Sequence, residues 1–90
     1  MMDIVYAPKA HQDLLHFLEA DKKIFAKTLK LITQTARNPF EGDGSPEPLK
    51  HELVGYWSRR INAEHRLVYI VSDTADAVRF ISCRGHYTDL

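Results

Sequence analysis

Cysteine, net charge and long apolar runs are scarce in this 90-residue sequence. Cys83 is the only cysteine, so no disulfide forms within the chain, as is typical of cytosolic proteins. The first residues lack the basic start and apolar run of a signal peptide, and no apolar run reaches the ~18 residues that span a bilayer. Twelve basic residues balance twelve acidic ones, whereas a general nucleic-acid binder is usually basic. We therefore expect one cytoplasmic domain over residues 1–90, with no membrane partner.

The first forty residues predict a strand and two helices. A β-prone run covers residues 3–6. Pro8 suits the first turn of a helix, which we expect to end near Glu19. Asp21 is the predicted N-cap of a second helix, and Pro39 prevents that helix from continuing. The short connection predicts that the two helices form a hairpin.

The apolar period changes after residue 40. Residues 41–48 hold two glycines and two prolines, which predicts a loop with a flexible Gly-Asp-Gly part. Strand-like runs follow over residues 55–61, 65–71 and 77–83. The expected fold is therefore an α+β domain: one strand, a two-helix hairpin, then an antiparallel β meander with the helices packed on one face.

Glu47 stands between Pro46 and Pro48. Each ring fixes its own φ near about −65°, and Pro48 favours an extended conformation at Glu47. We expect the prolines to hold this carboxylate stiffly, which lowers the entropy cost of positioning a base. The alternative is an ordinary surface acid in a proline-stiffened turn.

The meander is expected to bring Arg66 close to His86 and Tyr87. Arg66 lies at the start of one predicted strand, whereas His86 and Tyr87 lie at the end of the next one. Antiparallel neighbours place the start of one strand beside the end of the other. In the last strand, one alternating set is expected to share a face: Val78, Phe80, Ser82, Arg84 and His86. The alternatives are a strand arginine lying along the sheet and an ordinary strand end.

Glutamate, arginine and histidine together suit metal-free cleavage of RNA. The 2′-hydroxyl needs a base and the departing 5′-oxygen needs an acid. A guanidinium group matches the geometry of the phosphate oxygens, and a ring such as Tyr87 stacks on a base or aligns the phosphate.

Basic residues gather between residues 50 and 66 despite the neutral total, with four basic residues against two acidic ones. The candidate RNA-binding residues are Lys50, His51, Arg59 and Arg60. The alternative for such a cluster is a solvated face. Trp57 is expected to be a core anchor rather than a platform for bases.

No metal site or cofactor is expected. His11 and His16 are five residues apart, a poor helical spacing for shared ligands, and neither an HExxH motif nor a Cys/His ladder is present.

The run 39-PFEGDGSPEPLKHELVGYWSRRINAEHRLVYIV-71, followed by 83-CRGHY-87, closely resembles the YoeB family of bacterial toxins within the RelE-like superfamily. Five motifs carry the resemblance in order: PFEG, PEPLKH, G-[aromatic]-WSRRI, EHRLVY and C-R-x-H-Y. The likeness extends more weakly into the second helix. It implies the RelE-like, microbial-ribonuclease-like fold.

The resemblance implies a ribosome-dependent mRNA endonuclease that cuts in the A site and leaves a 2′,3′-cyclic phosphate or 3′-phosphate and a 5′-hydroxyl. By motif position, Glu47 is the general base, His86 the general acid, Arg66 the phosphate-stabilising cation and Tyr87 an orienting residue. Lys50 and Arg60 would contact RNA. The implied partners are a YefM-like antitoxin, the ribosome with its mRNA, operator DNA through the antitoxin, and a second copy in a homodimer.

Two other functions use the same fold. ParE-like proteins share the architecture but act on DNA gyrase, and gyrase inhibition has no use for a general acid–base pair. A degenerate toxin would only bind its antitoxin and repress the shared operon. Induction of the gene separates the three, because a nuclease halts protein synthesis, a gyrase inhibitor causes DNA damage and a binding protein does neither.

Overall fold

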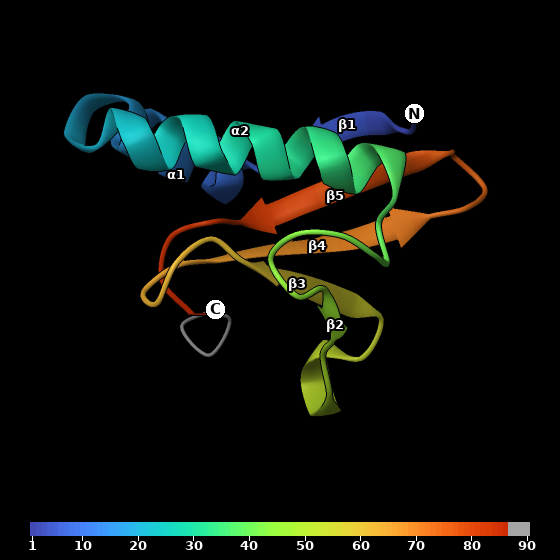
Figure 1. Cartoon of the computed structure of the whole chain (residues 1–90). Helices are drawn as coiled ribbons and strands as arrows, with labels where there is room; N and C mark the ends of the chain where they lie inside the picture. The colour runs from blue at the N-terminus through green and yellow to red at the C-terminus, as the bar shows by residue number, and fades with distance from the viewer. Residues whose placement is uncertain (87–90) are drawn as a thin grey trace.

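The computed structural model of the chain describes residues 1–86. Two helices cover one face of a five-stranded sheet (Figure 1). The elements follow in the order β1 (Asp3–Tyr6), α1 (Pro8–Ala20), α2 (Lys22–Arg37), β2 (Glu47–Pro48), a short 3₁₀ helix η1 (His51–Leu53), β3 (Tyr56–Arg60), β4 (Arg66–Ser72) and β5 (Ala77–Ser82). The predicted α+β fold class is confirmed.

The sheet is mixed, with the strand order β1-β5-β4-β3-β2. The strands β2 to β5 pair antiparallel in sequence order, which is the predicted meander, whereas β1 pairs parallel to β5. Two features were not predicted: the parallel pairing and the two-residue strand β2, which lies within the predicted loop 41–48.

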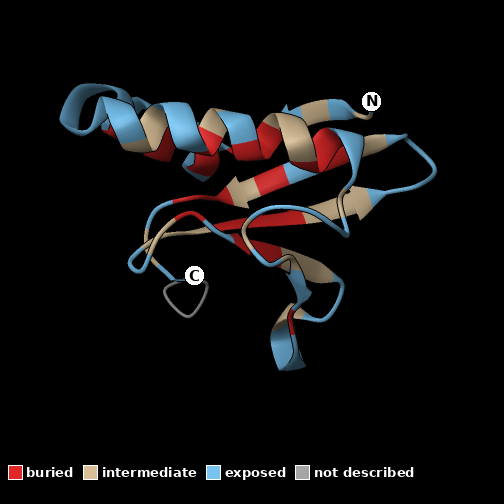
Figure 2. Ribbon diagram, viewed as in Figure 1, coloured by how far each residue is buried: buried red, intermediate tan, exposed pale blue. Residues whose placement is uncertain are grey.

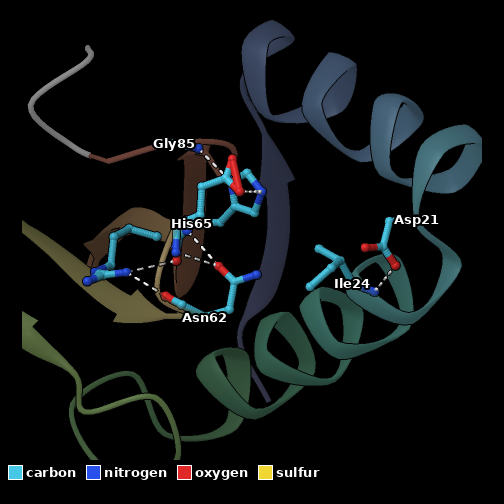
Figure 3. Close-up of polar contacts among 7 residues, drawn as sticks. Asp21, Ile24, Asn62, His65 and Gly85 are labelled. Atoms are coloured by element: carbon cyan, nitrogen blue, oxygen red, sulfur yellow. Dashed lines mark hydrogen bonds and ion pairs between the residues drawn. The ribbon is translucent and has the colours of Figure 1, made fainter.

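Helix boundaries follow the sequence signals. Pro8 opens α1, and Asp21 caps α2 by accepting a hydrogen bond from the backbone N–H of Ile24 at 3.2 Å (Figure 3). Within residues 1–86, neither helix has the length and apolar content of a membrane span.

The core lies between the helices and the sheet (Figure 2). Each layer contributes buried apolar side chains: Ala10, Leu14 and Phe17 from α1, Leu31, Ile32 and Ala36 from α2, and Leu67, Tyr69, Val78 and Phe80 from the sheet. Trp57 packs against this cluster as predicted and contacts the ring of Phe40 at 4.8 Å between centroids.

A β-bulge interrupts the pairing of β4 with β5. Val68 pairs with Ser82, but the next residue, Tyr69, pairs with Phe80, so Ile81 is an extra residue. Neighbouring residues of β4 point to opposite faces, and paired residues point to the same face. Phe80 and Ser82 therefore lie on opposite faces, and the prediction that alternate residues from Val78 to His86 share one face is wrong.

Candidate active site

Glu47 lies in β2, one of the two edge strands of the sheet. It is exposed and pairs with Ser58 of β3, and Pro48 pairs with Trp57. The pairing continues beyond β2, because the N–H of Leu49 donates to the carbonyl of Tyr56 at 2.9 Å. Both its flanking prolines and this ladder thus fix the backbone that carries the carboxylate.

Lys50 and His51 lie just beyond β2, after Leu49, and both are exposed. Together with Glu47, Pro48 and Leu49 they line a cavity of about 320 Å³. His51 has φ of 58°, in the left-handed region that residues other than glycine rarely adopt. The predicted base and two predicted RNA-binding residues therefore share one small cavity.

The face of the sheet opposite the helices, called here the outer face, is defined by β4. Leu67 and Tyr69 of this strand pack in the core with the helices. Arg66 and Val68 alternate with them, so they point to the outer face.

The strand register places three predicted site residues on this outer face. Val68 pairs with Ser58, which pairs with Glu47. Arg66 pairs with Arg60 two residues along the same ladder. Because paired residues point to the same side of a sheet, the outer face carries Glu47, Arg60 and Arg66.

Arg66 is held by the connection between β3 and β4. Its Nη1 donates to the carbonyls of Asn62 at 2.7 Å and His65 at 3.2 Å. Its backbone N–H donates to the carbonyl of Gly85 at 2.9 Å. The residue after Gly85 is His86, which is exposed. The structure therefore brings the backbone of His86 next to the start of β4, as the meander predicts.

Tyr87, the fourth predicted catalytic residue, lies outside the described residues.

Arg59 differs from its predicted role as an RNA-binding residue. Its exposed fraction is 0%. The guanidinium donates to the hydroxyl of Tyr69 and to the side-chain carbonyl of Gln34. It also donates to three loop carbonyls, those of Asn38, Glu41 and Asp43. Because the Arg59 guanidinium is buried and its donors are occupied, it cannot contact RNA. Arg59 is instead a core residue that holds the loop before β2 in place.

The Gly-Asp-Gly part of that loop, residues 42–44, is fastened rather than flexible. The N–H of Asp43 donates to the Gln34 side chain at 2.6 Å, and the carbonyl of Gly44 accepts from the N–H of Arg60 at 2.6 Å. Gly44 has φ of +81°, and a Cβ there would lie 2.8 Å from the Arg60 carbonyl. Glycine is therefore required by a close backbone approach.

A second cavity, of about 600 Å³, lies between α2 and the connection from β3 to β4. Lys27, Lys30 and Arg60 line it, with Asp43 as the acidic member. The two lysines were not among the predicted site residues, although their spacing of three residues on α2 indicates one shared helix face. This cavity extends the positive charge around Arg60.

Buried titratable groups lie on the helix side of the sheet. Burial raises the pKa of the Cys83 thiol to about 12; the charge of Asp13 adds to the rise and that of Lys9 opposes it. Burial also raises the pKa of Tyr69, against the opposing effect of the Arg59 hydrogen bond and charge. Within residues 1–86, no three His, Cys, Asp or Glu side chains gather in a way that would hold a metal ion.

The outer face thus combines a carboxylate, two guanidinium groups and an adjacent histidine backbone. A carboxylate accepts a proton, an imidazolium gives one up, and a guanidinium binds phosphate oxygens. Such a set has the parts for acid–base cleavage of a phosphodiester.

Known protein sequences resemble this chain over nearly its whole length. The sequence matches the family described as YoeB-like toxin of bacterial type II toxin–antitoxin system over residues 6–87. Toxin YoeB from Escherichia coli (strain K12) is 50% identical over 86 residues, which cover 96% of this chain and 100% of that protein.

Solved structures resemble the whole chain. A YoeB/ParE toxin from Agrobacterium tumefaciens has a TM-score of 0.91 at 43% identity, covering 96% of this chain and 100% of that one. From Staphylococcus aureus, the YoeB dimer has a TM-score of 0.85 at 45% identity over 96% and 98%. The heterotetrameric YoeB–YefM complex of that species has a TM-score of 0.84 at 44% identity over 97% and 99%. The RelBE2 complex from Mycobacterium tuberculosis shares the fold alone, with a TM-score of 0.74 at 22% identity over 94% and 98%.

Proposed function

The chain belongs to the family of YoeB-like toxins of bacterial type II toxin–antitoxin systems, and we propose that it acts as a ribosome-dependent mRNA endoribonuclease. The resemblance found in the sequence is thereby confirmed at the level of the family, and the RelE-like fold with it. The activity, its site residues and its partners form the proposal.

The observation that carries the proposal is the register of the outer face. The ladder from β2 to β4 puts Glu47 and Arg66 on the same side of the sheet. The hydrogen bond from Arg66 to Gly85 brings His86 to the same end of β4. The residues proposed as base, phosphate-binding cation and acid come from three separate segments, and their arrangement around β4 supports the proposal.

The proposed reaction is attack of a ribose 2′-hydroxyl on the adjacent phosphorus. Glu47 takes the hydroxyl proton as the new O2′–P bond forms. Arg66 binds the phosphate oxygens as their charge grows, and His86 gives its proton to the 5′-oxygen as the P–O5′ bond breaks. The products are a 2′,3′-cyclic phosphate and a 5′-hydroxyl. The proposal assigns Tyr87 to orienting the substrate.

RNA binding is assigned to the exposed cations next to this site. Lys50, His51 and Arg60 are all exposed, and the first two share the cavity of Glu47. Arg59 is omitted from this assignment because it is buried. Phosphate contacts of this kind position the substrate without reading its sequence.

The proposed partners are a YefM-like antitoxin, a second copy of the chain, the ribosome and its mRNA. The S. aureus heterotetramer and dimer support the first two for this chain by similarity. The antitoxin is expected to supply a segment that folds on binding and to connect the complex to operator DNA. A cytoplasmic location is part of the same proposal.

The test is cleavage of mRNA in programmed ribosomes. The wild type is compared with Glu47→Ala and His86→Ala. Matched controls are Glu19→Ala and His11→Ala, which remove an exposed acid and an exposed histidine of α1. We expect cutting in the A site that leaves a 5′-hydroxyl and falls by ~10²-fold or more in the two site variants only, because proton transfer contributes ~10²–10⁴-fold.

Two results would contradict the proposal. Full activity in Glu47→Ala or His86→Ala would move the chemistry to other residues. No cutting by the wild type would leave a protein that only binds, and induction of the gene would then reveal either DNA damage, as from gyrase inhibition, or no growth effect.

A further inference from the structure

In the chain between β5 and His86, the backbone N–H groups bond to side chains instead of to a neighbouring strand. Strand β5 ends at Ser82, and the next three backbone N–H groups each donate to a side chain. Cys83 and Arg84 donate to Oδ2 of Asp13 at 3.0 and 3.2 Å. Gly85 donates to Nδ1 of His65 at 2.9 Å (Figure 3). Two residues from distant parts of the sequence thus hold the three residues that precede His86.

Asp13 reaches this segment from α1. Its exposed fraction is 7%, and the same Oδ2 atom also accepts from Nζ of Lys9 at 2.9 Å. A buried carboxylate needs such donors, because an unpaired buried charge is costly. Asp13 is therefore a buried acid whose carboxylate holds the start of this segment to the helix layer.

His65 reaches the segment from the other side. Because Nδ1 accepts the Gly85 N–H, the proton of the neutral imidazole lies on Nε2. The ring packs edge-on against Phe17, with centroids 5.0 Å apart and planes at 60°. Its backbone is fixed as well, since its N–H donates to Oδ1 of Asn62 at 2.7 Å (Figure 3). The acceptor atom is therefore held in both position and orientation.

Gly85 connects His65 to Arg66. Its N–H bonds the His65 ring, and its carbonyl accepts the N–H of Arg66. Its φ of +79° lies in the left-handed region that favours glycine. The path of the chain into His86 is thus set relative to the strand that carries the phosphate-binding arginine.

We propose that Asp13 and His65, called here the anchoring pair, are positioning residues that hold the 83–85 segment so that His86 meets the leaving oxygen beside Arg66. This inference rests on the proposed function. Neither residue touches the substrate. They act through the backbone, and a displacement of about 1 Å at a reacting group can cost ~10²-fold in rate.

The test at His65 separates its acceptor from its ring. His65→Asn keeps a side-chain oxygen close to the Nδ1 position and loses the ring. His65→Phe keeps the ring against Phe17 and loses the acceptor. Single-turnover cleavage at saturating protein is measured in programmed ribosomes, together with thermal unfolding. We expect His65→Phe to cut ~10–100-fold more slowly with an unchanged half-saturating concentration and near-wild-type unfolding. His65→Asn should recover most of the rate even where it unfolds earlier.

The test at Asp13 follows the same plan. Asp13→Asn keeps an acceptor for the two N–H groups, and Asp13→Leu removes it. Lys9→Gln is the matched control, because it removes the ion pair with Asp13 and leaves the acceptor. We expect the rate to fall in Asp13→Leu, to recover in Asp13→Asn and to stay at the wild-type level in Lys9→Gln.

A measurement without RNA keeps the inference distinct from the proposed function. Hydrogen exchange of the Gly85 amide should be slow in the wild type and in His65→Asn and fast in His65→Phe. Wild-type cleavage by His65→Phe with a fast-exchanging Gly85 amide would overturn the positioning role. So would rates that follow the unfolding temperature alone. A wild type that does not cut would refute the proposed function, and the catalytic role of the pair with it, while slow Gly85 exchange would still report the hydrogen bond.

Discussion

Arg59 and Arg60 are neighbours in β3 with opposite environments. Arg59 is fully buried and donates to Tyr69, Gln34 and three loop carbonyls. Arg60 is exposed on the outer face. Strand alternation explains the difference, because consecutive side chains point to opposite faces. One arginine therefore supports the loop that leads to Glu47, and the other is exposed, as its proposed contact with RNA requires.

Arg59→Ala should destabilise the fold by about 3 kcal/mol or more, because several buried oxygens lose their donors at once. Urea unfolding followed by circular dichroism measures this. Arg60→Ala is the matched control and should change stability by less than about 0.5 kcal/mol while weakening RNA binding. Equal unfolding midpoints for the two variants would contradict the structural role of Arg59.

Cys83 makes stability depend on alkaline pH. Its thiol pKa rises from an ordinary 9.0 to about 12 in the folded protein. Above pH 9 the unfolded chain loses this proton and the folded chain keeps it, so stability falls as the pH rises, by at most about 1.4 kcal/mol per pH unit. Urea unfolding from pH 8 to 11 should show a shallower decline in Cys83→Ala. The tyrosines with raised pKa values, Tyr6 and Tyr69, are present in both proteins. An identical decline would contradict this effect of Cys83.

At the scale of elements, β2 is short and lies at the sheet edge. Its two residues pair with β3 on one side. Proline has no N–H for a ladder, so it suits an edge strand, where it also discourages pairing with another chain. The strand presents Glu47 while its flanking prolines restrict the backbone.

The double variant Pro46→Ala with Pro48→Ala should lower both stability and cleavage. Each proline that fits its native φ contributes about 0.4–1 kcal/mol by restricting the unfolded chain, so the expected total is roughly 1–2 kcal/mol. We expect the cleavage rate to fall several-fold because Glu47 samples more positions. Pro8→Ala, at the start of α1, is the control that should leave cleavage unchanged. Wild-type cleavage by the double variant would refute this account of the prolines.

At the scale of the whole molecule, zero net charge conceals an uneven distribution. The outer face carries Arg60 and Arg66, and Lys50 lines the cavity of Glu47. Lys27 and Lys30 of α2 line a separate cavity together with Arg60. A neutral protein avoids general attraction to nucleic acids, whereas one local cluster of cations can still bind phosphates in the proposed function. Specific docking rather than long-range attraction should therefore dominate its binding.

Binding to a short single-stranded RNA should depend only weakly on salt. With Lys50, Arg60 and Arg66 as the contacting cations and a slope of about −0.7 per phosphate, log K should fall with log salt with a slope near about −2. Arg60→Ala should reduce this slope by ~0.7, whereas Lys23→Ala, at an exposed site on α2, should not. Fluorescence anisotropy from 50 to 300 mM salt measures it. A slope steeper than about −4 would show that other cations bind RNA.

Local signals predicted most elements and some of the site. Pro8, Asp21 and the alternating runs located the helices and three meander strands, because those signals depend on nearby residues. The parallel pairing of β1 with β5 depends on residues far apart in the sequence, and the Ile81 bulge leaves an apolar pattern compatible with simple alternation. The juxtaposition of Arg66 and the His86 backbone was predicted because meander geometry alone determines it.

Buried polar residues were the main omission. Arg59 alternates with Trp57, a predicted core residue, so strand parity alone indicates that it faces the helices. His65 and Leu67 are two residues apart, so the same alternation points both side chains to the helix side of the sheet. Asp13 lies three residues after Ala10 and four before Phe17, on the buried stripe of α1. The polar character of these three residues suggested that they lie at the surface, whereas the apolar pattern around them indicates that their side chains point into the protein.

The parallel pairing of β1 with β5 determines how late in synthesis the sheet can be completed. Asp3 of β1 finds its partner Ala77 only when β5 has been made, and residues 83–86 come later still. At roughly 5–20 residues per second, synthesis leaves the nascent chain without a complete sheet for seconds. Long-range pairing of this kind also folds slowly. Cleavage by the proposed mechanism therefore begins only after residues 83–86 have been made and β1 has paired with β5, which gives an antitoxin already present an interval in which to capture the chain.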